Sequence, residues 1–392
     1  MSTVSNSRIL LFLLAALVSI GPLSTDMYLP AFPEMTAYFS ASSSQIQLTL
    51  SSYLIGLAAG QLLCGPISDI LGRKKPLLFG AILYMISSVL CVLTEHIEIF
   101  IAARCLTGLS AAAMLVVARS AAADHYHGSA LTKFFSVMMM IQGLAPVLAP
   151  ILGGYLVAFF PWQHLFTILG LFSALLFAAV LLTFQESLPP EKRLSFQGKK
   201  LLQGFSALLK NPSFFSHCLL QFFVFSSLFA YISGAPFIFQ VQYGFTSQSF
   251  GLLFGAVGCC MAGSGYITTL LAGKVNEKTI LKWELLRGFS GALLFLIAVL
   301  LKMPVYLLIL LLIATQTTLP NIASTSFSLA LKNCPYIGIA SALIGFFNTI
   351  CGSIVSPIVG LGNKPDFTLA CVLLVCESLA GLTYWLGIRQ MK

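Results

Sequence analysis

Two charged residues interrupt apolar stretches that are otherwise suited to a lipid bilayer. Asp26 stands near the end of the first apolar run, and Arg104 stands early in the fourth. A charge within a bilayer is costly, so both are candidates for function. A carboxylate can bind and release a proton, and a guanidinium at similar depth can modulate that exchange. We therefore predict a pair that need not be permanently closed, and opening it would free Asp26 to take up a proton or a cationic ligand. The alternative is that Asp26 only ends the first helix at the lipid–water interface.

A short polar connection between the second and third apolar runs carries a second set of charges. It reads GPISDILGRKKP from Gly65, and Gly65 and Gly72 allow a sharp turn between close-packed helices. The basic cluster that starts at Arg73 and Lys74 indicates the cytoplasmic side of a membrane. Asp69 lies one helical turn earlier and can pair with that cluster. From these residues the loop is at least a topology signal.

The fifth apolar run is rich in proline and glycine. Pro146 and Pro150 each remove a helix hydrogen bond, which predicts a kinked helix. Gly143, Gly153 and Gly154 allow a neighbouring helix to approach closely. Such a helix is suited to serve as a hinge and to limit proton leak. The alternative is a kinked packing helix without a coupling role.

Composition identifies the elements that must position these residues. Hydrophobic residues make up 58% of the 392 residues and charged residues only 8%, and the mean hydropathy is +0.94. A soluble domain carries about 25% charged residues, so this is a polytopic membrane protein. The net charge is +9, but most of the Lys and Arg residues are in short connections between apolar runs. They form no stripe of basic residues interleaved with aromatic ones, so nucleic-acid binding is not expected. The ten cysteines show no framework of disulfides or metal ligands.

We predict an all-α protein with twelve membrane spans. An even number places both termini on one side, and Arg8, Arg389 and Lys392 indicate the cytoplasm. The hydrophilic stretch 185–212 divides the chain into two six-helix halves, 1–184 and 213–392, with a substrate site expected between halves near the midplane. The remaining loops are too short for a soluble domain. The expected spans are 9–29, 46–64, 77–94, 98–121, 132–156, 163–184, 213–236, 248–272, 279–301, 304–327, 337–360 and 367–388.

Several of these motifs resemble those of a known family. The polar loop is similar to the signature G-x-x-x-D-x-x-G-R-K/R-K/R between helices 2 and 3 of the major facilitator superfamily. The segment DMYLPAFP from Asp26 resembles the drug:proton antiporters with twelve spans, above all the bicyclomycin-resistance (Bcr/CflA) branch. RCLTG from Arg104 resembles R-x-x-Q-G, with Thr107 in place of glutamine. The fifth run resembles the antiporter motif G-x-x-x-G-P-x-x-G-G, with Ala149 in place of the second glycine.

The resemblance implies roles for further residues. In that family the helix 1 carboxylate and the helix 4 arginine are implicated in proton coupling, which assigns those roles to Asp26 and Arg104. The resemblance also implies a gating role for the signature loop, with a topology signal alone as the alternative. Arg119 and Asp124 are expected to anchor the inner end of span 4 or to pair with the signature loop. A metal site at His125 and His127 is not expected. Residues expected to line a substrate cavity, with packing as the alternative, are Tyr28, Gln142, Tyr231, Asn321 and Asn348. Residues expected to extend their side chains to the membrane interface are His217, Glu284, Arg287 and Glu377.

We therefore expect a secondary transporter of the bacterial inner membrane that exports small amphipathic molecules in exchange for protons. The alternatives are a dedicated exporter of one metabolite, such as a siderophore or amino-acid derivative, and a proton-coupled importer. The near-complete antiporter motif favours exchange. A membrane-embedded enzyme or sensor is disfavoured because no nucleophile–base constellation occurs at one depth. We expect a monomer, with protons and lipid as its other partners and no cofactor, metal or nucleic acid.

Overall fold

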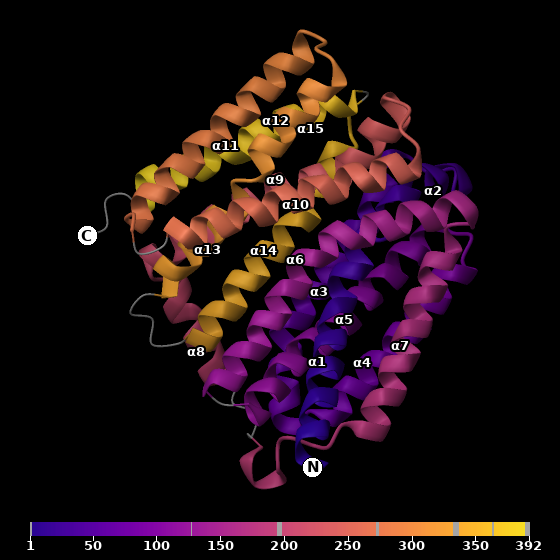
Figure 1. The fold of residues 1–392 in the computed structure, drawn as a ribbon, viewed down its shortest axis with the longest axis vertical. Coiled ribbons are helices and arrows are strands. Elements are labelled where there is room, and N and C mark those ends of the chain that lie inside the picture. Colours follow the sequence, from indigo (N-terminus) through magenta and orange to yellow (C-terminus); the bar gives the residue numbers. More distant parts are fainter. Residues whose placement is uncertain are drawn as a thin grey trace. The chain divides into compact units, whose positions relative to one another are not determined.

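The structure, a computed structural model, describes residues 2–126, 128–193, 198–271, 274–331, 337–362 and 364–388. These ranges fold as helices without a β-strand (Figure 1). The first nine elements are α1 (Ser2–Asp26), η1 (Leu29–Ala31), α2 (Phe32–Tyr38), α3 (Ser43–Leu71), α4 (Lys74–Leu93), α5 (Ile97–His125), α6 (Gly128–Phe159), α7 (Gln163–Thr183) and η2 (Pro190–Lys192). The rest are α8 (Gly198–Leu209), α9 (Pro212–Pro236), η3 (Phe237–Gln242), α10 (Ser247–Leu271), α11 (Glu277–Leu300), α12 (Val305–Gln316), α13 (Leu319–Leu331), α14 (Ile337–Val359), α15 (Pro365–Thr383) and η4 (Tyr384–Ile388).

The predicted fold class is confirmed. Within the described ranges, 11 helical segments are long and apolar enough to cross a membrane. The predicted fifth span lies in α6, a helix of 32 residues. α8, which falls in the predicted linker, is a short amphipathic helix rather than a span. The chain is a multi-pass membrane protein.

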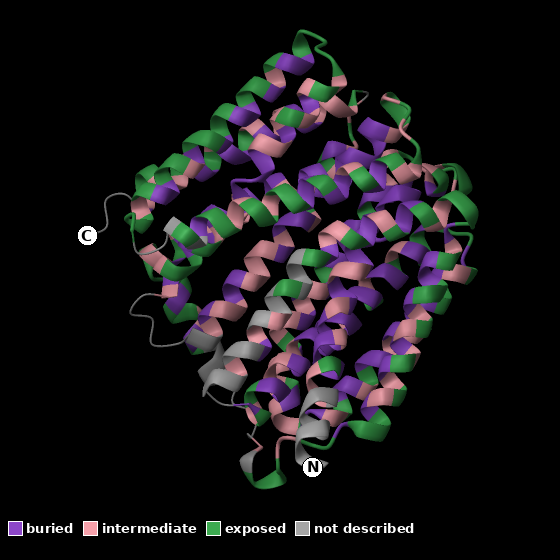
Figure 2. Ribbon diagram, viewed as in Figure 1, coloured by how far each residue is buried: buried purple, intermediate pink, exposed green. Residues whose placement is uncertain are grey.

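The chain forms two compact units. The first contains residues 1–41 and 52–197, and the second contains residues 42–51 and 198–392. In the linker the division therefore falls after residue 197. Within each unit, buried residues line the faces between helices, and exposed residues lie on the outward faces (Figure 2).

Two predicted spans are interrupted in the structure. The first helix was expected to continue to about residue 29, but α1 ends at Asp26 and the chain continues through η1 and α2. Pro30 has no N–H for the carbonyl of Asp26, and its ring is incompatible with that carbonyl in a continuous helix. The predicted tenth span, 304–327, is divided into α12 and α13, with Thr317 and Thr318 between them. Pro320 begins the next turn, where the missing N–H is tolerated.

Glycines set the closest helix contacts of the first unit. A Cβ at Gly108 of α5 would lie 1.9 Å from the carbonyl oxygen of Tyr53, and one at Gly56 of α3 would lie 2.0 Å from that of Cys105. α3 and α5 therefore pack backbone against backbone, as small residues permit in membranes. This contact brings Tyr53 beside the helix that carries Arg104.

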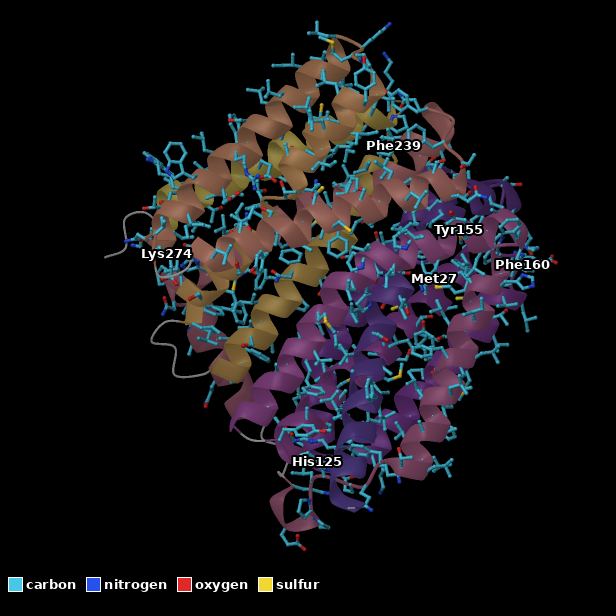
Figure 3. The ribbon with its side chains drawn as sticks, viewed as in Figure 1. Met27, His125, Tyr155, Phe160, Phe239 and Lys274 are labelled. Carbon is cyan, nitrogen blue, oxygen red and sulfur yellow. The ribbon has the colours of Figure 1, made fainter. Side chains whose placement is uncertain are left out.

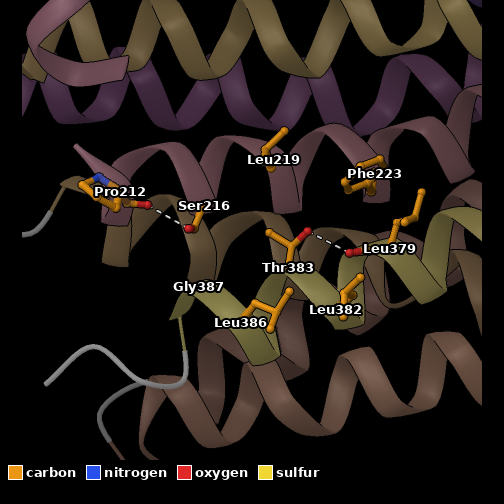
Figure 4. A pocket seen from close by; sticks show the side chains of 9 residues that line it. All are labelled: Pro212, Ser216, Leu219, Phe223, Leu379, Leu382, Thr383, Leu386 and Gly387. Carbon is orange, nitrogen blue, oxygen red and sulfur yellow. Dashed lines mark hydrogen bonds between the residues drawn. The ribbon is translucent and has the colours of Figure 1, made fainter. Parts of the chain in front are cut away.

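In the second unit, α9 packs against α14, α15 and α13, and α11 packs against α15 and α12. An open apolar groove of about 470 Å³ lies between α9 and α15 (Figure 4). Its hydroxyls are satisfied locally, since Ser216 donates to the Pro212 carbonyl at 2.8 Å and Thr383 to the Leu379 carbonyl at 2.8 Å. The side chains that line the groove are mainly apolar. Its remaining lining residues are Leu219, Phe223, Leu382, Leu386 and Gly387.

Candidate proton and substrate site

Arg104 is fully buried in the first unit, with 0% of its surface exposed. Its guanidinium carbon lies 4.3 Å from the centre of the Tyr28 ring and 4.5 Å from that of Tyr53. The ring of Phe166 lies 5.5 Å away. Aromatic faces attract cations, more strongly where water is excluded. Aromatic rings therefore surround this charge.

The hydrogen bond that orients Arg104 comes from the end of α1. The Nη2 group donates to the carbonyl oxygen of Ser24 at 3.0 Å. Because α1 ends at Asp26, the last carbonyls of the helix lack partners within it and carry the negative end of the helix dipole. Arg104 thus acts as a hydrogen-bonding cap for the C-terminal end of α1. Its Nε and Nη1 have no hydrogen-bond partner in the described part of the chain.

Asp26 is also buried, with 5% of its surface exposed. Within the described residues no ion pair joins it to Arg104, and no hydrogen bond to its carboxylate is present. The predicted pair is therefore open in this structure, because Arg104 bonds to the Ser24 carbonyl instead. The two groups remain on adjoining elements, since α1 packs against α5.

The antiporter motif lies against the end of α1. A Cβ placed on Gly153 of α6 would lie 1.8 Å from the carbonyl oxygen of Met27, the residue after Asp26 (Met27 is labelled in Figure 3). Only a residue without a side chain permits this approach. Pro146 and Pro150 lie within α6, as predicted. The motif therefore determines how closely α6 approaches the candidate proton site.

The signature loop forms a closed ion-pair network within the first unit. Arg73 donates to Asp69 at 2.6 Å, to Ser68 at 2.7 Å and to Asp124 at 2.9 Å. Asp124 ends α5 beside His125, which Figure 3 labels, so the predicted contact between Asp124 and the loop is confirmed. Burial would lower the pKa of Arg73, but its bonds to both carboxylates raise it. Gly72 has φ +87°, which explains the glycine.

Glu186, which the sequence did not single out, completes this loop. Its carboxylate accepts the backbone N–H of Arg73 at 2.7 Å and that of Lys74 at 3.1 Å, at the first turn of α4. Burial would raise the pKa of Glu186, but these bonds and one from Leu188 lower it overall. The free N–H groups at the start of α4 could have suggested an acidic cap. No local signal placed that cap over a hundred residues away.

The predicted cavity residues of the second unit are held by neighbours. Asn348 of α14 donates to Gln221 of α9 at 2.9 Å. Asn321 of α13 donates to Ser264 at 2.8 Å and to Glu284 at 3.0 Å. Tyr231, 2% exposed, stacks on Phe254 with ring centres 5.1 Å apart. These polar groups therefore tie helices together whether or not they also meet a substrate.

The other predicted residues have simpler settings. Tyr28 is buried against Arg104. Arg119 forms no ion pair within the described residues, and its Nε is buried without a partner. Gly65 lies within α3 and Gly154 is buried in α6. The side chain of Gln142 and the surroundings of Gly143 lie outside the described part of the chain.

The expected extension to the interface is wrong for His217 and Glu377, which are buried, whereas Glu284 is partly exposed. His217 is 3% exposed and bonds through Nδ1 to Ser326 at 3.0 Å. Glu284 pairs with Arg287 at 2.6 Å. Glu377 is 1% exposed. The position of a residue around its helix decides whether its side chain faces a neighbouring helix. The prediction used only its distance from the helix end, which does not give that direction.

Comparison with known proteins identifies the family. The model of the Major Facilitator Superfamily matches residues 12–357. An uncharacterized MFS-type transporter of Bacillus subtilis, YdgK, is 36% identical over 96% of this chain and 94% of its own. A bicyclomycin resistance protein homolog of Haemophilus influenzae is 28% identical over 100% and 99%. A crystal structure of a bacterial homologue of the human lysosomal transporter Spinster has a TM-score of 0.77, 14% identity and 98% coverage of each chain. The last likeness concerns the fold alone.

Proposed function

Because the chain belongs to the Major Facilitator Superfamily, we propose that it is an efflux antiporter that exports small amphipathic molecules in exchange for protons. The observation that carries this proposal is the buried carboxylate of Asp26, which pairs with none of the described residues and lies beside the helix that holds Arg104. A buried carboxylate without a partner must hold a proton or accept a cation. Its occupant can therefore change during a transport cycle.

The setting of Arg104 gives the exchange a physical basis. Its two unpartnered nitrogen groups leave donors available to an anionic group. When Asp26 loses its proton, Arg104 can stabilise the resulting carboxylate by moving from the Ser24 carbonyl. When Asp26 is neutral, Arg104 returns to the end of α1. Proton loss would thus be linked to a change at the junction of α1, α5 and α6.

The direction of transport rests on two supports. The relative from Haemophilus influenzae is named for bicyclomycin resistance, and resistance is a usual consequence of export. The sequence of α6 also resembles the antiporter motif. Small molecules, protons and lipid are the proposed partners, and a monomer is the proposed working form.

We also propose the topology expected from the sequence, with both termini and the loop at Arg73 in the cytoplasm. A cysteine placed at Ser187, which bonds to Asp124 beside this loop, should be labelled from the inner side only. One placed at Ser247, at the start of α10, should be labelled from the outside. A background without the native cysteines is required. The opposite labelling pattern would contradict this topology.

Transport into inverted membrane vesicles tests the function. A panel of neutral and cationic amphipathic compounds would be added while a pH-sensitive dye reports the inner pH. We expect uptake of several compounds against their gradients, each accompanied by proton loss from the vesicle interior. Uptake of one compound alone would indicate a dedicated exporter. Substrate and protons moving in the same direction would contradict antiport.

A further inference from the structure

Glu377 is a second buried carboxylate, and the mechanism above does not use it. It lies in α15, well inside a helix that spans Pro365–Thr383, and is 1% exposed. Its Oε2 atom has no hydrogen-bond partner in the described part of the chain. A carboxylate in this setting is costly unless a proton or cation neutralises it.

The surrounding helices make room for this side chain. A Cβ placed on Gly288 of α11 would lie 2.5 Å from Glu377 Oε2 and 3.4 Å from the hydroxyl of Thr318. Thr318 lies in the break between α12 and α13. The hydroxyl of Ser227 on α9 lies close to the carboxyl, but within the described part of the chain it forms no hydrogen bond of normal geometry. Small and hydroxylated residues of three elements thus surround one acidic group beside an interrupted helix.

The nearby cation, Arg287, already has a carboxylate partner. Arg287, next to Gly288, pairs with Glu284 at 2.6 Å and donates to the hydroxyl of Thr317 at 3.3 Å. Glu284 also accepts from Asn321. The positive charge is therefore neutralised within its own network. None of the ion pairs among the described residues includes Glu377.

The elements packed against α15 bring no other countercharge to this carboxyl. On α9 lies His217, which is bonded to Ser326. α11 also carries Glu277, Lys278 and Lys282 near its start, all six or more residues before Gly288; Lys282 is exposed, and the carbonyl of Lys278 accepts from Tyr384 in η4. α9 also carries Tyr231, and the first turn of α15 carries Asp366, which accepts from Gln242. The other titratable groups at these contacts are thiols and phenols, which are Cys218, Cys351, Cys371, Cys376 and Tyr384. Among the described residues, the groups that lie against this carboxyl are therefore hydroxyls, and no cation pairs with it.

We propose that Glu377 is a proton-binding site of the second unit and that it holds a proton in this structure. A neutral carboxylic acid resolves the missing countercharge. It also provides an O–H donor for the neighbouring hydroxyls. Its position beside the break between α12 and α13 links loss of the proton to the packing of that interrupted helix, because an ionised group would require a new partner there. This inference does not depend on antiport or on Asp26.

Infrared titration of the purified protein in lipid vesicles tests the proposal. Wild type should show a carboxylic-acid C=O band at neutral pH, and that band should weaken in Glu377→Gln, which retains the shape of the side chain. Glu284→Gln is the matched control, because its ion-paired carboxylate should contribute no acid band. Asp26→Asn separates the first site, since the Glu377 band should persist in it.

Two arms make the result decisive. Wild type grown with isotope-labelled glutamate should shift the band, which assigns it to glutamate without any substitution. If wild type at neutral pH shows no carboxylic-acid C=O band that shifts with labelled glutamate, the proposal is overturned. Loss of the band when sodium replaces choline at constant pH would also overturn it, in favour of a metal cation at the carboxyl. Persistence in both salts supports proton binding.

Discussion

Two arginines of the first unit sit in opposite settings. Arg73, in the loop between α3 and α4, donates to two carboxylates and a hydroxyl. Arg104, inside α5, donates to one backbone carbonyl and lies between two tyrosine rings. Arg73 has its full countercharge at hand, whereas Arg104 has only dipoles and ring faces.

The difference separates a structural cation from one that can respond. A charge held by two carboxylates must break both bonds to change partner. A charge held by a carbonyl and ring faces can accept a carboxylate at little cost, because nothing ionic is lost. The loop arginine is therefore expected to fix the inner turn, and the buried one to follow the state of Asp26.

Asp26→Asn should have the largest effect. The amide preserves size and hydrogen bonding but cannot carry a proton, so transport against a gradient should be abolished. Binding of a neutral substrate should partly survive. Vesicle uptake driven by a proton gradient, together with binding to the purified protein, measures both. Full uphill transport by this variant would remove Asp26 from the coupling mechanism.

Arg104→Lys compared with Arg73→Lys tests the two settings directly. Lysine keeps the charge but loses the planar group that lies over Tyr28 and Tyr53. Loss of about 1–2 kcal/mol corresponds to a reduction of about 5- to 30-fold, which we expect in transport by Arg104→Lys. The same replacement at Arg73 retains an ionic partner and should cost less. Equal losses, with equal amounts of protein in the membrane, would refute the distinction.

Gly153→Ala should disturb the first site through packing. The added methyl group would meet the Met27 carbonyl and force α6 away from the end of α1. Overpacking of this kind costs about 1–3 kcal/mol, which thermal unfolding in detergent should register. Gly263→Ala in α10 is the matched control, since no atom lies within 4 Å of its added Cβ. We also expect increased proton leak in Gly153→Ala. If Gly153→Ala unfolds at the same temperature as the control and leaks protons no faster, the close approach of α6 to α1 is unimportant.

Asp69→Asn and Asp124→Asn should have smaller and unequal effects. Asp69 is the more exposed partner of Arg73, with 38% of its side chain exposed against 22% for Asp124. Asp124 also accepts from Ser187. Asp124→Asn should therefore lower the unfolding temperature more, while both variants retain their topology. If Asp69 also latches the inner gate, its loss should increase labelling from the cytoplasm. Normal labelling and turnover in Asp69→Asn would limit its role to the ion pair.

Glu186→Gln should give the smallest effect, visible mainly in its pH dependence. Because the folded state lowers the pKa of Glu186, its contribution is present above the ordinary glutamate pKa, about 4.3. It is lost as pH falls through the lowered value. Wild type should therefore lose more stability on acidification than Glu186→Gln does. Unfolding temperatures of the two proteins between neutral and acidic pH test this, and parallel curves would contradict it.

The sequence predicted the spans and the residues of the first site because both depend on local rules. Apolar length marks a span, and a charge within it is conspicuous. A pair that need not be closed was predicted, but the partner that Arg104 takes instead could not be, since the Ser24 carbonyl belongs to another helix. Glu377 was misread because depth along a helix does not specify which face is buried. Glu186 was missed because its partners are distant in the chain.

The position of Pro30, four residues after Asp26, has a consequence for protein engineering. This interval places the carboxylate at the end of α1, because a proline four residues later cannot donate to the carbonyl of Asp26. The spacing between Asp26 and Pro30 is carried by the segment itself. A chimera that receives the whole first helix should therefore keep the carboxylate at the same depth in the membrane. A single residue inserted between Asp26 and Pro30 would move the end of the helix by one residue relative to Asp26. Such an insertion would test register alone, with every side chain of the site still present.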